Sequence, residues 1–375
     1  MQTSSFLARI AVLVSALCVA ATSFADEGIA VGRSLALTGA LKAYGEAKRD
    51  GGDAYIEKIN KAGGVAGRRI NLVTLDDAYQ PAKTVENLRQ LTDKNAPSAF
   101  LGLFGVPTVA AALPELLKLK IPAVGLTSGM AQVRTPHNPY AFPVRASYAD
   151  EAHKLVAQIK TIGVSKISVI YTDNPFGEGV KDSLLEALRK EGLTALAVKV
   201  NASGTLAAKA IAQAVATEPQ AVFLAMLSQA AVPVLVELKK NNFHAQLYTF
   251  SPVDTTVILQ ALGKDASGLG ISQVVPIPQG SRLPIVVEYT EALKVLGRGT
   301  PSFYGLEAFI EAKILIEALR RAGSAAANPA AVLKALETLR TYDVGGYVVS
   351  YGPGVRTGSS FVEVDIIDSQ GVLRR

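Results

Sequence analysis

Residues 29–77 decide the fold, and they read IAVGRSLALTGALKAYGEAKRDGGDAYIEKINKAGGVAGRRINLVTLDD. The stretch begins and ends with short apolar runs, residues 29–37 and 69–75, which are typical of strands buried on both faces. Between them, apolar residues recur at helical spacing at Ala47, Gly51, Tyr55 and Ile59. The glycines of NKAGG (60–64) can adopt the left-handed conformation that ends a helix. This order predicts a parallel strand–helix–strand unit.

The same alternation continues along the chain. Further strands are expected at residues 98–104, 121–126, 166–172, 193–200, 220–226 and 246–250. An amphipathic helix is expected where Ala152, Leu155, Val156, Ile159 and Ile162 recur at helical spacing. The strands form two sets of four on the same plan, with YAFPVRAS (140–147) as the link between them.

The last third of the chain extends this plan. After a second link at GISQVVPIP (270–278), helices are expected at residues 284–296, 302–322 and 329–339, and closing strands at 345–351 and 360–367. A chain of 375 residues exceeds what one hydrophobic core usually supports. We therefore predict an α/β protein with two similar lobes.

Composition and charge argue for a folded protein without a nucleic-acid partner. Hydrophobic residues make up 49% of the chain and charged residues 19%, which is not the composition of a disordered segment. The formal net charge is +6, but the Lys and Arg residues are scattered over expected helix faces. A solvated surface explains this distribution better than a basic binding patch.

The first 25 residues predict a secretory signal. Arg9 precedes an almost wholly apolar run from Ile10 to Ala21, and Ser23-Phe24-Ala25 offers small residues for cleavage near Ala25. The run is shorter than the ~20 residues of a membrane-spanning helix. Cys18, the only cysteine, lies inside this segment, so the mature chain can form no disulfide. We expect export to a bacterial periplasm.

The sequence is poor in groups that catalysis or metal binding requires. His137, His153 and His244 lie far apart, in no spacing that suits a metal. The glycine-rich segments at 63–68 and 268–270 lack the strand–loop–helix context of a phosphate cradle, and no GxSxG elbow is present. We expect no catalytic residue, no metal and no cofactor.

Asp76 and Asp77 allow two interpretations. They follow a strand and could form an acid/base pair, but a cap for the helix that begins near Pro81 is the simpler interpretation.

Polar loops follow most of the expected strands. In the first half these are residues 37–45, 104–108, 125–130 and 147–152, and in the second half 172–177, 225–230 and 250–255. Open α/β sheets bind ligands at the carboxyl ends of their strands, where helix N-termini present free N–H groups. The loops therefore predict a ligand-binding crevice.

At these loops the chain resembles one known family. The matching segments are LTGALKAYGE (37–46), INKAGGVAGRRINLVTLDDAYQPAKTV (59–85), FGVPTVAAALP (104–114), IPAVGLTSG (121–129), NPYAFPVRASYADEA (138–152), VIYTDNPFGEGV (169–180) and GGYVVSYGPGVRTGS (345–359). They resemble the type I periplasmic binding proteins, specifically the leucine/isoleucine/valine-binding proteins of bacterial ABC transporters. The likeness runs from about residue 28 to residue 365.

The resemblance implies a fold and its division. It implies two Rossmann-like lobes with parallel sheets flanked by helices, joined by a three-crossing hinge, which close over a ligand. We expect lobe one at residues 26–146 plus 276–344, and lobe two at 147–275 plus 345–375.

The resemblance also implies ligand-binding residues. In lobe one, Tyr44 is implied to cover the ligand, a turn is implied to bind its carboxylate, and two hydroxyl residues are implied to complete that turn. The turn comprises Gly105, Val106 and Thr108, and the hydroxyl residues are Thr127 and Ser128. In lobe two the implied closing contacts are Tyr148, Phe176, Met226 and Ser251.

Each residue also has a structural interpretation. Tyr44 can be a helix-start residue that packs on its neighbour, but an aromatic ring in such a loop has little core to fill, so the ligand role is favoured. Thr127 and Ser128 can simply cap a local turn, and the two interpretations are balanced. Phe176 and Met226 can be core residues, which for Met226 is the favoured interpretation.

Two departures from the family pattern concern the ligand. Val106 stands where the turn usually has a serine, and Pro252 stands near the position where amino-acid binders carry a glutamate for the ligand ammonium. Asp254 is close by, without a clear match. A buried ammonium without a counter-charge is costly. An aliphatic or aromatic carboxylate, or an amide, therefore joins amino acids among the expected ligands.

We expect a monomeric periplasmic solute-binding protein that delivers its ligand to the membrane permease of an ABC importer. The alternative is a periplasmic ligand-sensing module that signals to a membrane receptor. A cytoplasmic repressor with this fold is disfavoured by the export signal.

Overall fold

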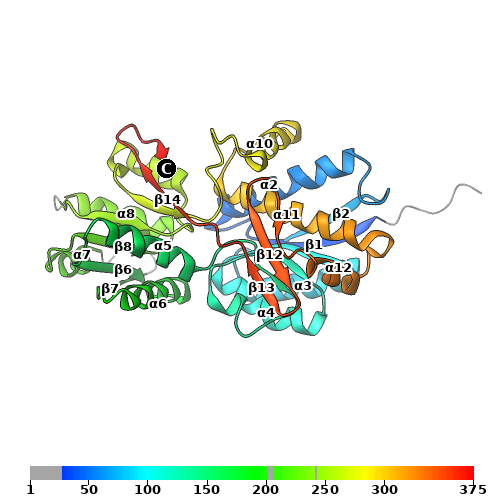
Figure 1. Ribbon diagram of the computed structural model, residues 1–375, viewed down its shortest axis with the longest axis horizontal. Coiled ribbons are helices and arrows are strands. Elements are labelled where there is room, and N and C mark those ends of the chain that lie inside the picture. The colour runs from blue at the N-terminus through cyan, green and yellow to red at the C-terminus, as the bar shows by residue number, and fades with distance from the viewer. Residues whose placement is uncertain (1–27, 202–206, 241–242) are drawn as a thin grey trace, which may run out of the picture.

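The computed structural model describes residues 28–201, 207–240 and 243–375. The expected signal peptide lies outside these residues. Two lobes lie side by side, with lobe one in blue, cyan and orange and lobe two in green (Figure 1). Each lobe is a mainly parallel sheet with helices against it, as the sequence predicts.

Lobe one begins with five strands and three long helices. The chain runs through β1 (Ile29–Leu35), α2 (Lys42–Lys61), β2 (Ile70–Asp76), α3 (Pro81–Asn95), β3 (Ala99–Phe104), α4 (Val106–Leu119), β4 (Ala123–Thr127) and β5 (Ala141–Phe142). The sheet order is β2-β1-β3-β4-β5, with every pair parallel. All residues of β3 and β4 are buried, which explains their continuous apolar sequence.

Lobe two repeats the plan. It contains α5 (Tyr148–Thr161), β6 (Ile167–Thr172), α6 (Pro175–Lys190), β7 (Leu196–Val200), α7 (Ala207–Val215), β8 (Ala221–Ala225), α8 (Ser228–Lys240), β9 (Gln246–Thr249), α9 (Thr255–Leu262) and β10 (Gly270–Gln273). Its parallel strands follow the order β7-β6-β8-β9-β10, the same winding as in lobe one. The parallel part of each sheet thus has one more strand, β5 or β10, than the four expected per lobe.

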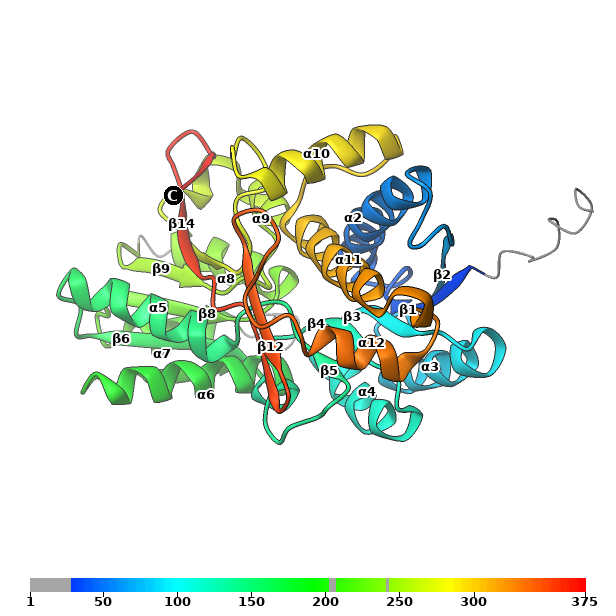
Figure 2. The ribbon, with the colours of Figure 1, turned by 45° about the vertical axis from the view of Figure 1, so that its right-hand side comes forward.

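The rest of the chain returns to lobe one and then to lobe two. It forms α10 (Pro284–Leu296), α11 (Phe303–Ala322), α12 (Pro329–Leu336), β11 (Tyr342–Asp343), β12 (Val348–Gly352), β13 (Val355–Gly358), β14 (Glu363–Ile367) and β15 (Leu373–Arg374). Short 3-10 turns lie at Ala131–Val133, Gly263–Ala266 and Gly323–Ala325. Helix α11 packs closely on α2, and the antiparallel strands β14 and β15 extend the lobe-two sheet beyond β10 (Figure 2).

The chain passes between the lobes three times. The crossings are residues 143–147, 274–283 and 359–362, each lying between elements of different lobes. Because the crossings are short, the lobes are held together at one edge and can move relative to each other about it. This is the three-crossing arrangement that the resemblance implies.

The third crossing lies later in the chain than the expected boundary between the lobes at residue 345. We assigned residues 345–375 to lobe two, but β12 and β13 pack on lobe one. The Tyr351 hydroxyl donates to the Pro143 carbonyl at 2.7 Å, and its ring lies 5.2 Å from that of Phe142 in the lobe-one core. The division stays a proposal, and these contacts favour moving its last boundary to the turn after Gly358.

The expected helix cap at Asp76-Asp77 is wrong in detail. Helix α3 begins after Gln80, which makes no side-chain cap. Asp76 instead accepts hydrogen bonds from the N–H groups of Leu37 and Thr38, and so shapes the loop after β1. Asp77 accepts from the Thr84 hydroxyl in the first turn of α3. The carboxylates therefore organise two loops beside the cleft.

Among the described residues, every helix falls short of the length and apolarity that a membrane span requires.

Candidate functional site

A cavity lies where the carboxyl ends of the strands of both lobes face each other. Its walls come from both lobes and from one crossing. The lining residues are Leu41, Tyr44, Tyr79, Phe104, Gly105, Val106, Thr127, Arg145, Tyr148, Phe176, Leu227, Pro252 and Tyr304. The cavity volume is about 20 Å³, which is room for about one water molecule. A larger solute requires the walls to move apart, so the lobes are in contact in a closed arrangement.

Six of the thirteen residues that line the cavity are aromatic. The ring of Tyr44 lies 5.8 Å from that of Phe104, in a stacked arrangement, and 4.9 Å from that of Tyr304, edge to face. On the lobe-two side, the rings of Tyr148 and Phe176 lie edge to face at 5.6 Å. Such pairs are favourable beyond the area they bury. They give the cavity flat, apolar walls.

Hydrogen bonds of two tyrosines at the cavity join the lobes. The hydroxyls of Tyr44, in lobe one, and Ser228, in lobe two, are 2.9 Å apart. Tyr304, on α11, donates to the carbonyl of Pro252 in lobe two at 3.1 Å. Burial raises the pKa of Tyr44 to about 12, so its hydroxyl stays protonated. Tyr44 therefore lies in the cavity, where the sequence places it, and also holds the closed arrangement.

The expected carboxylate turn lies at the start of α4. Gly105 and Val106 line the cavity, and Gly105 has a φ of 97°, which favours glycine. Thr108 is buried away from the cavity, and its hydroxyl donates to the Phe104 carbonyl and, at 3.1 Å, to that of Gly105. The structure therefore brings two of the three predicted residues to the cavity, and Thr108 turns inward.

Tyr79 covers this turn. Its backbone has a φ of 63° and follows Ala78 with a φ of 48°, two left-handed residues in succession. The ring lies directly on Gly105, where an added Cβ would be 2.2 Å from the Tyr79 Cε2 atom and 2.9 Å from its hydroxyl oxygen. Burial raises the pKa of Tyr79, and the backbone N–H of Val106 faces the hydroxyl. Left-handed non-glycine residues are strained and cluster at functional sites.

Thr127 and Ser128 follow β4. Thr127 lines the cavity, but its Oγ1 accepts from Lys48 Nζ at 2.5 Å and donates to Glu311 Oε1 at 2.9 Å. Ser128 is fully buried, is not among the lining residues, and accepts from the Met130 N–H at 3.4 Å. For Ser128 the geometry matches the local-turn interpretation.

Of the four ligand-binding residues predicted in lobe two, two line the cavity and two do not. Tyr148 and Phe176 line the cavity. Met226 is buried in the core beneath β8, which is the structural interpretation favoured from the sequence. Ser251 lies beside the cavity, where its hydroxyl donates to Glu151 Oε1 at 2.9 Å and accepts from Arg145.

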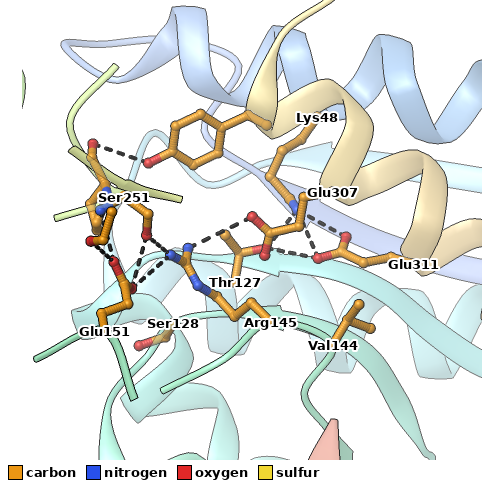
Figure 3. A network of polar contacts seen from close by, with 12 residues as sticks. Lys48, Thr127, Ser128, Val144, Arg145, Glu151, Ser251, Glu307 and Glu311 are labelled. Carbon is orange, nitrogen blue, oxygen red and sulfur yellow. Dashed lines mark hydrogen bonds and ion pairs between the residues drawn. The ribbon is translucent and has the colours of Figure 1, made fainter. Parts of the chain in front are cut away.

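Arg145 is the one charged residue among those that line the cavity (Figure 3). It lies in the first crossing and pairs with Glu151 of lobe two at 3.4 Å and with Glu307 of α11 at 3.7 Å. Burial lowers its pKa, but the charges of Glu307 and Glu151 raise it above the ordinary value, so Arg145 is always charged. Its Nε and the Oε1 of Glu307 have no hydrogen-bond partner among the described residues.

A second buried ion pair lies behind Thr127. Lys48 Nζ contacts both carboxylate oxygens of Glu311, at 3.0 and 2.9 Å, and both side chains are 1% exposed (Figure 3). Burial raises the pKa of Glu311 to about 7, against the opposing effect of Lys48. This pair fixes the orientation of Thr127 at the cavity wall.

This fold recurs in known proteins. The sequence profile of the periplasmic binding proteins matches residues 28–360. The chain belongs to this family. An amino acid binding protein of Pseudomonas aeruginosa is 24% identical over 327 residues, covering 82% of this chain and 81% of the relative.

Solved structures agree with this assignment. A substrate-binding periplasmic protein from Ralstonia solanacearum is 30% identical with a TM-score of 0.85, covering 92% of this chain and 99% of that one. A possible leucine/isoleucine/valine-binding protein from Rhodopirellula baltica is 26% identical with a TM-score of 0.86, covering 94% and 97%. The fold is that of the type I periplasmic binding proteins.

Several residues that line the cavity of this periplasmic binding protein were not predicted from the sequence. Leu41, Phe104, Leu227 and Pro252 lie in loops that the sequence marks as the crevice, so the signal was present without singling them out. The other missed residues are Tyr79, Arg145 and Tyr304.

Asp254 does not replace the missing glutamate. Its side chain caps α9 by accepting from the Thr256 N–H at 2.8 Å, and its own N–H donates to Ser228. It is not among the residues that line the cavity. In the described part of this periplasmic binding protein, no group of three His, Cys, Asp or Glu side chains is placed to hold a metal.

Proposed function

We propose that this protein captures a small organic solute between its lobes in the periplasm and delivers it to the membrane permease of an ABC importer. The cavity carries the proposal, because its lining comes from the loops after the strands of both lobes. Because its walls come from both lobes, the site is complete only when the lobes close. A solute that touches both walls then favours the closed form.

Contacts across the cleft support a closing mechanism. Tyr44 of lobe one and Phe176 of lobe two present their rings to the same cavity, and Arg145 in the crossing contacts carboxylates of both lobes. Ligand binding and lobe closure therefore act on the same side chains. A permease that recognises the closed form would receive loaded protein.

The solute class follows from the walls and from the relatives. Aromatic and aliphatic side chains form most of the lining, which suits a compact apolar body with one polar end. Relatives are named as amino acid binding and possible leucine/isoleucine/valine-binding proteins. We propose a solute like a branched-chain amino acid, or a related carboxylate or amide.

A ligand screen tests the function. Protein unfolded in guanidinium, dialysed and refolded is titrated with branched-chain and aromatic amino acids, short aliphatic and aromatic acids, and their amides. We expect at least one compound to raise the melting temperature and to bind in calorimetry with a micromolar or lower Kd. No binding across the panel would contradict the proposal.

A pair of variants locates the binding site. Leu227 lines the cavity, so Leu227→Trp fills it and is expected to weaken binding of the selected compound at least about 100-fold, since ~2.7 kcal/mol of contacts is lost. Leu117 is 48% exposed on α4, so Leu117→Trp is the matched control and should bind as the wild type does. Equal affinity for both variants would place the site elsewhere.

A further inference from the structure

We propose that this cleft selects an uncharged amide over the corresponding carboxylate, and that Tyr79 sets this preference by covering the N-terminus of α4. The inference rests on the proposed function and names the ligand class of the same site. It differs from the expectation that the turn at residues 105–108 binds a carboxylate.

The donors of the expected carboxylate site are already used within lobe one. The Gly105 N–H donates to the Thr127 carbonyl at 3.2 Å, and the Thr108 hydroxyl donates into its own turn. The Thr127 hydroxyl donates to Glu311. Ser128 is fully buried and outside the cavity lining. A ligand carboxylate would have to break these bonds, and each broken bond leaves a buried polar group unpaired.

Tyr79 covers the N-terminus of α4, where a ligand carboxylate would otherwise bind. Its ring lies on Gly105 and 5.7 Å from the ring of Phe104, which places the hydroxyl at the first turn of α4. The left-handed backbone at Ala78 and Tyr79 holds the ring there, because the loop is pinned by Asp76 and Asp77 through bonds to the N–H groups of both residues at 2.9 Å. The Val106 N–H and the positive end of α4 thus face a phenol in place of a ligand.

The charges around the cavity disfavour anionic ligands. Arg145 is the one lining cation, and two carboxylates, Glu151 and Glu307, already surround it. The local sum of one positive and two negative charges opposes a further anion.

A ligand with a neutral hydrogen-bond acceptor suits the unpaired donor of Arg145. The Nε–H of Arg145 is buried without a hydrogen-bond partner among the described residues, and the side chain lines the cavity. The carbonyl oxygen of an amide accepts such a bond without adding charge. The aromatic walls then hold the apolar part of the molecule.

Matched pairs of ligands test the inference. Isovaleramide and isovalerate, benzamide and benzoate, and leucinamide and leucine are each titrated against refolded protein by calorimetry at pH 7.5. We expect one of the uncharged amides, isovaleramide or benzamide, to bind at least about tenfold more tightly than its acid, a difference of ~1.4 kcal/mol. Tighter binding of an acid, or of leucine, would overturn the inference and leave the proposed function standing. Silence of the whole panel would overturn both.

A variant tests the role of Tyr79. Tyr79→Phe removes the hydroxyl that faces α4 but keeps the ring, and we expect the amide-to-acid affinity ratio to fall at least about threefold as the helix terminus becomes available. Tyr171→Phe, on β6 outside the cavity lining, is the control and should keep the wild-type ratio. An unchanged ratio in Tyr79→Phe would overturn the assignment to Tyr79.

Discussion

Asp365 is fully buried on β14, and neither carboxylate oxygen has a hydrogen-bond partner among the described residues. Burial, together with the charge of Glu363, raises its pKa to about 7 despite the opposing effect of Arg375. The folded protein therefore holds a proton on Asp365 that the unfolded chain has released between about pH 4 and pH 7. Its contribution to stability is present at low pH and is lost as the pH rises through about 7.

The Asp365→Asn variant tests the direction of this pH dependence of stability. The amide is neutral at every pH, so at pH 8 the variant should unfold at a higher urea concentration than the wild type, by on the order of 1–3 kcal/mol. At pH 3 the difference should shrink to near zero, because Asp365 is then neutral in both the folded and the unfolded wild type. A variant that is less stable than the wild type at pH 8 would contradict this account.

Single residues also show where sequence reasoning stops. Tyr44, Gly105, Val106, Thr127, Tyr148 and Phe176 were predicted for the ligand site, and all six line the cavity. Their role in binding remains a prediction. Tyr79 was missed because its position depends on two left-handed residues, and no local pattern predicts that conformation for alanine and tyrosine. Arg145 was missed because its partners Glu151 and Glu307 come from different parts of the chain.

Helices α2 and α11 cross closely in lobe one. Gly51 of α2 faces the backbone of Gly305 of α11, and a Cβ added at Gly51 would lie 1.9 Å from the Gly305 carbonyl oxygen. The absence of a side chain therefore lets the two helices approach. This contact fixes α11, which carries Tyr304 and Glu307 to the cleft.

Gly51→Ala is expected to destabilise the protein by about 2–4 kcal/mol, because rigid backbones must move apart. Gly179→Ala in α6 is the control, since a Cβ there meets nothing within 4 Å. It should leave stability unchanged or raise it by about 0.5–1 kcal/mol. Urea unfolding of both variants measures the difference, and equal stabilities would contradict the close-crossing argument.

Helices and strands with a clear hydrophobic periodicity were predictable from the sequence. Strands that depend on hydrogen bonds to a neighbouring strand were not. The periodic segments at 284–296 and 302–322 became α10 and α11 almost residue for residue. Strands β5 and β10 are short, and they are strands because a neighbouring strand offers hydrogen bonds. Likewise, β12 reads as an ordinary strand, and its contacts with Pro143, Phe142 and Leu339 associate it with lobe one.

At the scale of the molecule, the repeated winding of two sheets explains why one cleft forms. The carboxyl ends of both sheets face each other, so loops distant in sequence share one cavity. The sequence predicts this architecture because the strand–helix alternation occurs twice. It does not predict how tightly the lobes close, which depends on contacts such as Tyr44 with Ser228.

The crystal structure of the protein bound to its tightest ligand is the most direct test of the central claim. We predict electron density for the solute between the lobes, in contact with Tyr44 of lobe one and with Phe176 of lobe two, and with an oxygen within hydrogen-bond distance of Arg145. A solute bound on one lobe alone, or outside the space between these residues, would contradict the account.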